Sequence, residues 1–346
     1  MERFTIGISP DFDTPGRGPL VAPGTFDAGD LDAKVQFERI SEQVAEYLPE
    51  HLKGLDVLLS LGPRVSAASL EGVEQLCAVG RCGVGYDNVD LDACTAADVA
   101  VYITPKAVAG PMAESIVLFI LALSHRLGAK DRMTRRGEWA ASQMPLGIEP
   151  RDRVIGTIGL GRISRETVRL LAAFRPGKLL AHDPYCDEAV ARDAGVELTS
   201  LEDLLRRSDY VLVSCPLTPE TRGLVGKDVL AQMKPTAYLI NTARGPIVDE
   251  DALADALEAG RLAGAALDVF AVEPMTDTGH RLLQFDNVIA TSHSIGWTEE
   301  LFRDMVRESC AGALAIAQGQ APPNVVNREV LNRPSFHRKL ARWGKA

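Results

Sequence analysis

The run VIGTIGLGRIS, residues 154–164, decides the fold of this chain. An apolar stretch that ends in Gly159-Leu160-Gly161 and continues into helix-forming residues has the strand, glycine turn and helix of a dinucleotide-binding unit. The first glycine permits the tight turn, and the second lets the backbone approach a pyrophosphate at the positive end of the helix. Ser164 stands where the pattern has its third glycine. An ordinary glycine-rich turn is the alternative that this run alone leaves open.

The next apolar run, KLLAHD at 178–183, ends in an acidic residue. Asp183 lies about 20 residues beyond the glycines, the spacing of the carboxylate that binds the ribose hydroxyls of NAD. Its charge would repel the 2′-phosphate of NADP. The two features together predict an NAD site.

Four more apolar runs follow, at YVLVSC (210–215), AYLINT (237–242), GAALDV (264–269) and NVIATS (287–292). Helices are expected at 162–174 and 249–259. Six strands that alternate with helices predict a doubly wound parallel sheet.

Apolar runs also precede the glycine motif. Strands are expected at FTIGIS (4–9), VLLSLG (57–62) and CAVGRCGVG (77–85), with a helical segment at 35–48. A long buried helix is expected at 112–127, a polar and irregular region at 129–150, and a last helix at 299–318. The alternation predicts a second α/β domain before the NAD site.

Size and charge limit the possible functions. At about 150 residues per domain, 346 residues predict two domains. Lys and Arg total 37 against 47 for Asp and Glu, a formal charge of −10. This balance argues against nucleic acid as the main partner, because such proteins neutralise phosphates with basic residues. An anionic substrate must be held by a local group of donors.

Targeting and metal-binding signals are few. The six cysteines form no C-x-x-C pair and have no metal-binding spacing with histidine, so we expect reduced thiols and no metal site. No secretory signal is expected from the first residues. The longest uninterrupted apolar run, Ile116–Leu123, has eight residues, against the ~20 that cross a bilayer. We therefore expect a cytoplasmic protein without a membrane span.

The basic segment 331–346 is either an interaction tail or a solvated end.

Three downstream runs lead into polar residues. AYLINTARG reaches Arg244, GAALDVFAVEP passes Asp268 and reaches Glu273, and NVIATSH reaches His293. The carboxyl ends of parallel strands line the ligand crevice of a doubly wound sheet, so these side chains should converge. Each residue taken singly has a structural explanation, whereas their joint occurrence after a dinucleotide motif favours catalysis.

The stretch from Cys215 to Pro274, with its NTARG and LDVF-x-x-EP motifs, closely resembles the D-isomer-specific 2-hydroxyacid dehydrogenases, which include D-3-phosphoglycerate dehydrogenases and glyoxylate-hydroxypyruvate reductases. Three further segments are similar to signature segments of that family: GRCGVGYDNVDLDAC (80–94), MAESIVLFILALSHR (112–126) and TIGLGRIS (157–164). The resemblance covers roughly residues 55–327.

The resemblance implies an NAD-dependent oxidoreductase that moves a hydride between nicotinamide C4 and C2 of a small D-2-hydroxy acid or 2-keto acid. His293 would be the proton donor and acceptor, and Glu273 would orient its ring and favour its charged form. Arg244 would pair with the carboxylate and the C2 oxygen of the substrate, which suits a planar fork of donors. Asp268 would hold the nicotinamide end.

Further contacts are implied by the same resemblance. The backbone N–H groups of Val84 and Gly85 would hold the substrate's carboxylate, together with Arg244 and His293. The implied cofactor contacts are Gly159, Gly161, Arg162, Ile163, Asp183, Cys215, Pro216, Thr221, Thr242, Ala243, Asp268 and Gly296.

Single residues narrow the chemistry within the family. Glu273 stands where the related formate dehydrogenases have Gln, and Val84 stands where phosphite dehydrogenases have Lys. Both differences favour hydroxy acid chemistry. Trp297, in HSIGWT where the family usually has HIGGAT, either shapes the pocket or packs between domains.

The implied fold class is α/β with two Rossmann-like domains. An NAD-binding doubly wound domain, 106–295, is inserted into a smaller flavodoxin-like substrate domain formed by 1–105 and 296–346, with hinges near 105 and 295. The helix at 112–127 resembles the family's dimerisation region, so a homodimer or a dimer of dimers is expected. The rival hypothesis is an NAD(H)-sensing binding protein of corepressor type on the same fold. The particular 2-hydroxy acid and the physiological direction stay open.

Overall fold

The computed structural model describes residues 3–14, 18–31, 33–140 and 146–344. The chain divides into two compact units. Unit 1 comprises Met1–Val108 and Trp297–Ala346, and unit 2 comprises Ala109–Gly296. The expected ranges, 1–105 with 296–346 and 106–295, differ from these at their edges. Unit 1 is thus formed by both ends of the chain, and unit 2 by one continuous segment.

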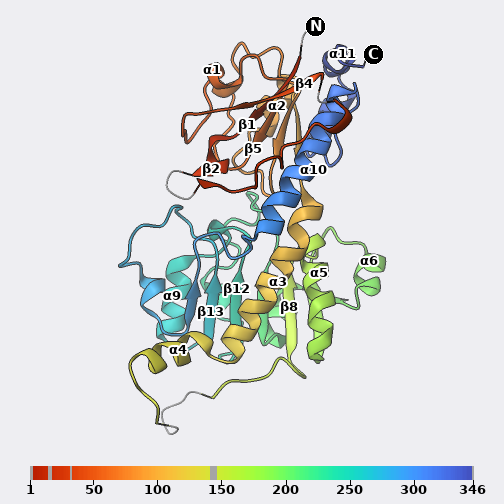
Figure 1. Cartoon of the computed structure of the whole chain (residues 1–346). Helices are drawn as coiled ribbons and strands as arrows, with labels where there is room; N and C mark the ends of the chain where they lie inside the picture. The colour runs from red at the N-terminus through yellow and green to blue at the C-terminus, as the bar shows by residue number, and fades with distance from the viewer. Residues whose placement is uncertain (1–2, 15–17, 32, 141–145, 345–346) are drawn as a thin grey trace. The chain divides into compact units, whose positions relative to one another are not determined.

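The sheet of unit 2 has seven parallel strands in the order β10-β9-β8-β11-β12-β13-β14 (Figure 1). The strands are β8 Val154–Ile158, β9 Lys178–His182, β10 Glu197–Leu198, β11 Tyr210–Val213, β12 Tyr238–Asn241, β13 Gly264–Leu267 and β14 Val288–Ala290. This doubly wound order changes direction between β8 and β11. All six predicted strands are present. The seventh, β10, has only two residues and therefore no alternation that a sequence pattern could reveal.

Apolar side chains are buried on both faces of this sheet. Tyr210 and Leu212 of β11 belong to the cluster on one face, whereas Val211 and Val213 belong to the cluster on the other. Helices α3 (Pro105–Ser124) and α5 (Arg162–Leu171) contribute to the first cluster. The second includes residues of α7 (Leu201–Arg207), α8 (Lys227–Leu230) and α9 (Glu250–Glu258). Helix α6 (Glu188–Asp193) packs beside β10.

Helix α3 is 20 residues long and its most apolar stretch has a mean hydropathy of 1.9, so by length and composition it could cross a membrane. Half of that stretch is buried inside the protein, and Ile116, Phe119 and Ile120 pack with the strands of unit 2. A core helix of a soluble protein passes the same test. The eight-residue run noted in the sequence understates this helix, because Glu114 and small residues interrupt its apolar character.

The segment after α3 differs from the prediction. The helix expected to reach residue 127 ends at Ser124, and the region expected to be irregular from 129 begins as α4, Leu127–Arg135. Arg126, between the two helices, has φ +54° and so interrupts the helical backbone. Within α4, Asp131 and Arg135 are one turn apart and form an ion pair. Pro145, part of the same predicted region, lies outside the described residues.

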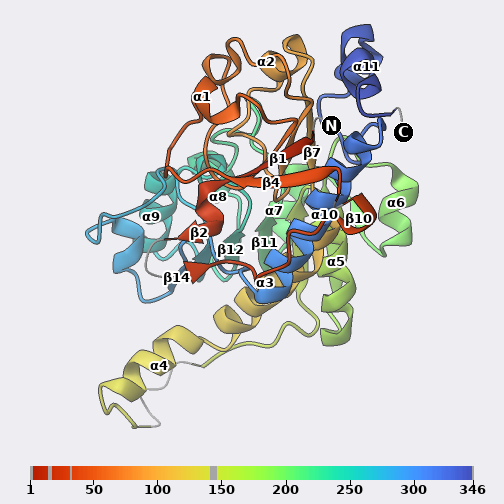
Figure 2. The ribbon, with the colours of Figure 1, turned by 45° about the horizontal axis from the view of Figure 1, so that its top comes forward.

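The sheet of unit 1 has five parallel strands in the flavodoxin-like order β4-β1-β5-β6-β7 (Figure 2). The strands are β1 Phe4–Ile8, β4 Val35–Arg39, β5 Val57–Ser60, β6 Ala78–Arg81 and β7 Ala100–Ile103, and β2 Asp13–Thr14 forms a separate antiparallel pair with β3 Gly18–Pro19. Unit 1 and unit 2 are therefore both parallel-sheet α/β folds, which confirms the predicted fold class.

The prediction of a helix at 35–48 is wrong. None of these residues, all of them described, is helical, and β4 pairs with β1 from Phe4–Val35 to Ile8–Arg39. Val35 and Phe37 alternate with polar residues, and the backbone of β1 supplies hydrogen bonds that outweigh local helix propensity. Strand β7 was not predicted.

Both ends of the chain build the core of unit 1. Helices α1 (Pro49–Leu52) and α2 (Leu91–Ala96) contribute to the cluster on one face, and α10 (Glu299–Ala317) packs on β5 and β6. The hydroxyl of Tyr102 in β7 donates to the carbonyl oxygen of Ser309 in α10 at 2.7 Å. The N–H of Val101 donates to Oδ1 of Asn327 at 2.8 Å.

The basic C-terminal segment is attached to unit 1 by helix α11, Pro334–Ala341. Nζ of Lys339 donates to the carbonyl oxygens of Leu76 at 2.9 Å and Ala97 at 2.8 Å, and Arg333 pairs with Asp98. Lys345 lies outside the described residues. The described residues also include short 3-10 helices at Pro10–Phe12, Gly29–Leu31, Ala68–Leu70, Ala172–Phe174, Gly245–Ile247, Arg281–Gln284 and Arg328–Asn332.

Candidate active site

The glycine turn after β8 has the backbone geometry that a dinucleotide requires. Gly159 has φ +95°, and a Cβ there would lie 2.8 Å from the carbonyl oxygen of Ser214 on the neighbouring strand end, so only glycine fits. Gly161 is the N-cap of α5, carries no side-chain cap and has open space where a Cβ would lie. The first turn of α5 therefore presents its backbone N–H groups to a phosphate.

Ser164, which replaces the third glycine of the pattern, is buried beneath this turn. Its hydroxyl donates to the carbonyl oxygen of Gly159 at 2.9 Å, and the hydroxyl of Thr157 donates to the same oxygen at 2.7 Å. Two side chains thus fix the turn from below. The departure from glycine is accommodated by a hydrogen bond that glycine could not make.

Asp183 follows β9 and lies beside the glycine turn. One carboxylate oxygen accepts the N–H of Leu160 at 2.8 Å, and the other accepts the N–H of Tyr185 at 2.9 Å. Each oxygen retains further acceptor capacity for a ribose hydroxyl. The residue predicted to read the ribose is therefore attached to the loop predicted to hold the pyrophosphate.

Other predicted cofactor contacts lie at the same carboxyl edge of the sheet. They follow β8, β11 and β12, and they are Arg162, Ile163, Cys215, Pro216, Thr221, Thr242 and Ala243. The hydroxyl of Thr221 donates to the carbonyl oxygen of Pro216 at 2.7 Å and so closes the loop between them. Burial raises the pKa of the Cys215 thiol to about 11, so it is neutral at physiological pH.

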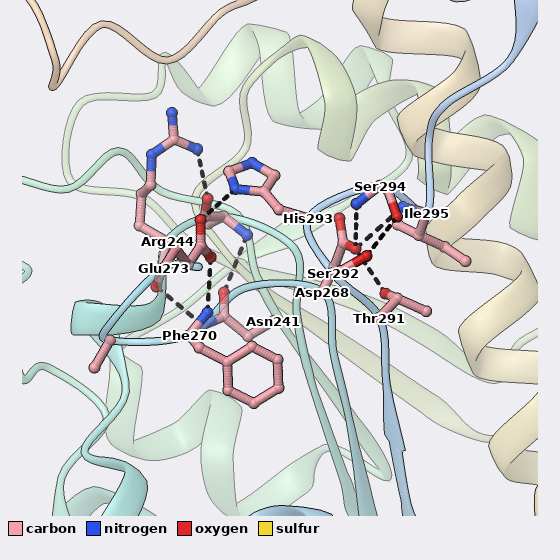
Figure 3. Close-up of polar contacts among 12 residues, drawn as sticks. Asn241, Arg244, Asp268, Phe270, Glu273, Thr291, Ser292, His293, Ser294 and Ile295 are labelled. Atoms are coloured by element: carbon pink, nitrogen blue, oxygen red, sulfur yellow. Dashed lines mark hydrogen bonds and ion pairs between the residues drawn. The ribbon is translucent and has the colours of Figure 1, made fainter. Parts of the chain in front are cut away.

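Glu273 and His293 form a close pair (Figure 3). Nδ1 of His293 lies 2.7 Å from Oε2 of Glu273, while Oε1 accepts the backbone N–H of Phe270 at 2.9 Å. Burial alone would raise the pKa of Glu273, but the hydrogen bonds from His293 and Phe270 and the charge of Arg244 lower it overall. An ionised carboxylate only accepts hydrogen bonds, so Nδ1 carries a proton and Nε2 is turned away from Glu273. The pair lines a cavity of about 670 Å³ with Phe270, Met275 and Leu283.

Arg244 lies just beyond the end of β12, where its neighbours fix the backbone. Nδ2 of Asn241 donates to the carbonyl oxygen of Arg244 at 3.0 Å, and Nη1 of Arg244 donates to the carbonyl oxygen of Ala243 at 2.7 Å. A Cβ on Gly245 would lie 1.9 Å from the carbonyl carbon of Phe270. Only glycine lets the Arg244 loop approach the loop of Glu273 this closely.

Asp268 follows β13 and is buried, with 2% of its surface exposed. Its Oδ1 accepts the hydroxyl of Thr291 at 2.6 Å, the N–H of Ser294 at 2.9 Å and the N–H of Ile295 at 3.1 Å (Figure 3). Its backbone oxygen accepts the N–H of His293 at 2.7 Å. In this structure Asp268 therefore holds the turn that carries His293.

The remaining residues singled out in the sequence are Val84, Gly85, Gly296 and Trp297. Val84 and Gly85 are in unit 1, after β6, where the turn is fixed by Thr104: its hydroxyl accepts the N–H of Gly83 at 2.8 Å. Gly296 is buried at the end of unit 2, next to Met112 of α3. Trp297 is half-exposed in unit 1, and its ring packs edge-on against that of Phe302.

Sequence reasoning missed three residues that shape the site: Asn241, Gly245 and Thr291. Asn241 and Gly245 flank Arg244 in the NTARG motif, so that motif was the available signal. Thr291 bonds to a residue 23 positions away and has no local signal.

The residues of unit 2 fit NAD. A turn with no room for a Cβ at Gly159, an uncapped helix N-terminus and a carboxylate bonded to the same turn are the features that bind the pyrophosphate and ribose of a dinucleotide. Gly159, the first turn of α5 and Asp183 would hold these groups.

Comparison with known proteins also indicates an NAD-binding domain in unit 2. Residues 117–294 match the family model described as "D-isomer specific 2-hydroxyacid dehydrogenase, NAD binding domain". Glyoxylate reductase of Aeropyrum pernix is 38% identical over 284 residues, which are 80% of this chain and 84% of that protein. D-3-phosphoglycerate dehydrogenase of Methanocaldococcus jannaschii is 37% identical over 290 residues, and the match spans 53% of its length.

The fold of a solved structure is similar to this one over nearly the whole chain. The D-lactate dehydrogenase of Aquifex aeolicus, crystallised with NAD and lactic acid, is 26% identical with a TM-score of 0.80, and the match covers 93% of this chain and 99% of that one. The matched family model lies in unit 2, which contains the dinucleotide turn and the Glu273–His293 pair. The protein therefore belongs to the D-isomer specific 2-hydroxyacid dehydrogenase family, and NAD is its cofactor.

Proposed function

We propose that this protein is an NAD-dependent oxidoreductase that interconverts a small D-2-hydroxy acid and the corresponding 2-keto acid. The observation that carries the proposal is the 2.7 Å contact between His293 and Glu273, at the sheet edge that also bears Arg244 and the dinucleotide turn. A paired acid–base group, a cation and a nucleotide turn in one unit are the parts that this reaction requires.

His293 would move the proton at Nε2. It would donate to the C2 oxygen when a keto acid is reduced and accept from the hydroxyl when a hydroxy acid is oxidised. Glu273 would fix the ring by accepting from Nδ1. The second bond to Glu273, from the N–H of Phe270, keeps the carboxylate in place while the ring changes charge.

Arg244 would hold the substrate, with its guanidinium on the carboxylate and the C2 oxygen. The backbone N–H groups of Val84 and Gly85, after β6 in unit 1, remain predicted donors for a substrate carboxylate. This local set of donors would offset the −10 charge of the chain, which would otherwise repel an anion.

Bound NAD supplies or accepts the hydride at C2. Asp183 would accept hydrogen bonds from the ribose hydroxyls and disfavour a 2′-phosphate, so NAD is preferred over NADP. The other oxygen of Asp268, Oδ2, would be directed to the nicotinamide end, since Oδ1 already accepts three hydrogen bonds.

A keto acid panel tests the proposal. Purified protein is mixed with NADH or NADPH and with glyoxylate, hydroxypyruvate, pyruvate or phenylpyruvate, and the loss of absorbance at the nicotinamide band is followed. We expect oxidation of NADH with at least one acid and slower use of NADPH. Tight NADH binding without any turnover would instead favour the NAD(H)-sensing binding protein.

We also propose a cytoplasmic homodimer formed through unit 2. The support is a set of exposed apolar residues on and after α3, namely Leu118, Leu127, Trp139 and Leu146, and the six cysteines are unpaired. Helix α4 extends outward from the rest of unit 2 (Figure 2). Light scattering after size exclusion should give twice the mass of the 37.3 kDa chain. A charged substitution, Leu118→Glu, should shift the protein to monomer.

A further inference from the structure

The turn that carries His293 has an unusual backbone. His293 has φ +53°, in the left-handed region that non-glycine residues seldom adopt. Such a conformation costs on the order of 1 kcal/mol or more and persists only where surrounding contacts hold it. The contacts that hold this one identify the residues on which the position of the imidazole depends.

Those contacts come mainly from Asp268. Its backbone oxygen accepts the N–H of His293, and its Oδ1 accepts the N–H groups of Ser294 and Ile295. The N–H donors begin at the left-handed residue and continue for two residues after it. The carboxylate therefore holds two N–H groups of the turn, and the backbone oxygen of the same residue holds the third.

The third bond to Oδ1 comes from a side chain. The hydroxyl of Thr291 donates to Oδ1 of Asp268 at 2.6 Å, the shortest of the three bonds. Thr291 lies two residues before His293, between the end of β14 and the turn. The Thr291–Asp268 bond thus connects the end of β14, before the turn, to the carboxylate that holds Ser294 and Ile295 after His293.

We propose that the Thr291–Asp268 hydrogen bond is a positioning device, which holds the His293 turn in its left-handed form and so keeps the imidazole against Glu273. This inference rests on the proposed function, because it concerns the delivery of the proton by His293. Thr291 is a positioning residue: it bonds to Asp268 and affects the proton transfer through the His293 turn. Its loss should misplace the imidazole without removing any group that binds NAD.

The variant Thr291→Val removes the hydroxyl and keeps the branched shape. Thr291→Ser restores the hydroxyl. A matched control is Thr199→Val, since Thr199 donates to Oδ2 of Asp203 at 3.1 Å and lies after β10, at the opposite edge of the same sheet. All variants are measured for kcat with the best keto acid, for the NADH Kd by fluorescence and for Tm.

We expect Thr291→Val to lower kcat by roughly 10- to 100-fold, because misplacement of a catalytic group by about 1 Å has effects of that order. Its NADH Kd should stay within about twofold of the wild-type value, because Oδ1 of Asp268 keeps its bonds to the N–H groups of Ser294 and Ile295. A twofold change in Kd corresponds to well under 1 kcal/mol. Thr291→Ser should recover most of the loss. The inference is overturned if Thr291→Val turns over as fast as Thr199→Val, or if Thr291→Ser is as slow as Thr291→Val.

A spectroscopic measurement separates this inference from the proposed function. In protein labelled with ¹⁵N-histidine, the Nδ1 signal of His293 is assigned by its absence in His293→Ala. In Thr291→Val this signal should shift or broaden as the contact with Glu273 loosens. If no acid is turned over by the wild-type protein, the proposed function fails, and an unchanged Nδ1 signal in Thr291→Val independently refutes the positioning role.

Discussion

Nδ1 of His293 lies 2.7 Å from Oε2 of Glu273, although the two residues follow different strands and are 20 positions apart in the sequence. Both carboxylate oxygens are engaged, one by the imidazole and one by the N–H of Phe270. The ring is therefore oriented by a group that is itself fixed. This geometry predicts how substitutions at the site change turnover, cofactor binding and stability.

His293→Ala should leave NADH binding intact and lower turnover by roughly 10²- to 10⁴-fold, the usual contribution of a general acid or base. Fluorescence titration with NADH measures the first property, and steady-state reduction of a keto acid measures the second. Retention of more than about a tenth of the wild-type rate would contradict the general-acid role.

Glu273→Gln should keep the side-chain shape and lower kcat by roughly 10- to 100-fold, because a neutral amide, which can both donate and accept, does not fix one tautomer of the ring. The NADH Kd should be unaffected. If kcat is unchanged while KM for the keto acid rises, Glu273 contributes to substrate binding and not to the proton transfer.

Acid should weaken the folded state partly through Glu273. Burial alone would raise the pKa of this carboxyl, but the His293 and Phe270 hydrogen bonds and the Arg244 charge lower it below its ordinary value of 4.5. A lowered folded pKa adds stability that is complete above the unfolded pKa and is lost as pH falls through the folded pKa. The difference in unfolding free energy between the wild type and Glu273→Gln should therefore be constant from about pH 7 to 5 and shrink in more acidic urea titrations. A difference that also stays constant below pH 5 would refute the assignment.

Asp183→Asn should relax the preference for NADH over NADPH. The amide keeps an oxygen for the N–H of Leu160 or Tyr185 but removes the charge that opposes a 2′-phosphate. We expect the ratio of kcat/KM for NADPH to that for NADH to rise about tenfold, which corresponds to about 1.4 kcal/mol. An unchanged ratio would mean that other residues set the preference.

Gly245→Ala should destabilise the protein by about 1–3 kcal/mol, because its Cβ would meet the backbone of Phe270 and that backbone cannot rotate away. Gly110→Ala is the matched control, since Gly110 lies in α3 with open space around the position of a Cβ. Thermal unfolding should show a lower Tm for Gly245→Ala alone. Equal Tm values would mean that the two loops separate at little cost.

Sequence patterns predicted the sheet of unit 2 because each of its six longer strands is a continuous apolar run, as expected for strands buried on both faces. They failed where the pattern was weak, and β7 was missed although its sequence AVYI is apolar throughout. The segment at 35–48 has an apolar spacing compatible with a helix, and only its pairing with β1 makes Val35–Arg39 a strand. Strand β10 is too short to carry any pattern.

The candidate site rests on similar patterns. Arg244, Glu273 and His293 were proposed because each follows an apolar run in a family motif. The bond from Thr291 to Asp268 and the contact between Gly245 and Phe270 join segments that are distant in sequence. Such pairings depend on strand order and loop shape, which no local pattern encodes.

Strand β7 has a consequence for biosynthesis. Its Tyr102 and Val101 bond to Ser309 and Asn327, which are translated some 200 residues later. On the ribosome, all of unit 2 can emerge and fold before unit 1 receives its last helices. During that interval the partners of β6 and β7 in α10 are missing and apolar surface is exposed. We expect chains that end at Gly296 and have been released from the ribosome to bind NAD yet to need chaperones for their N-terminal third.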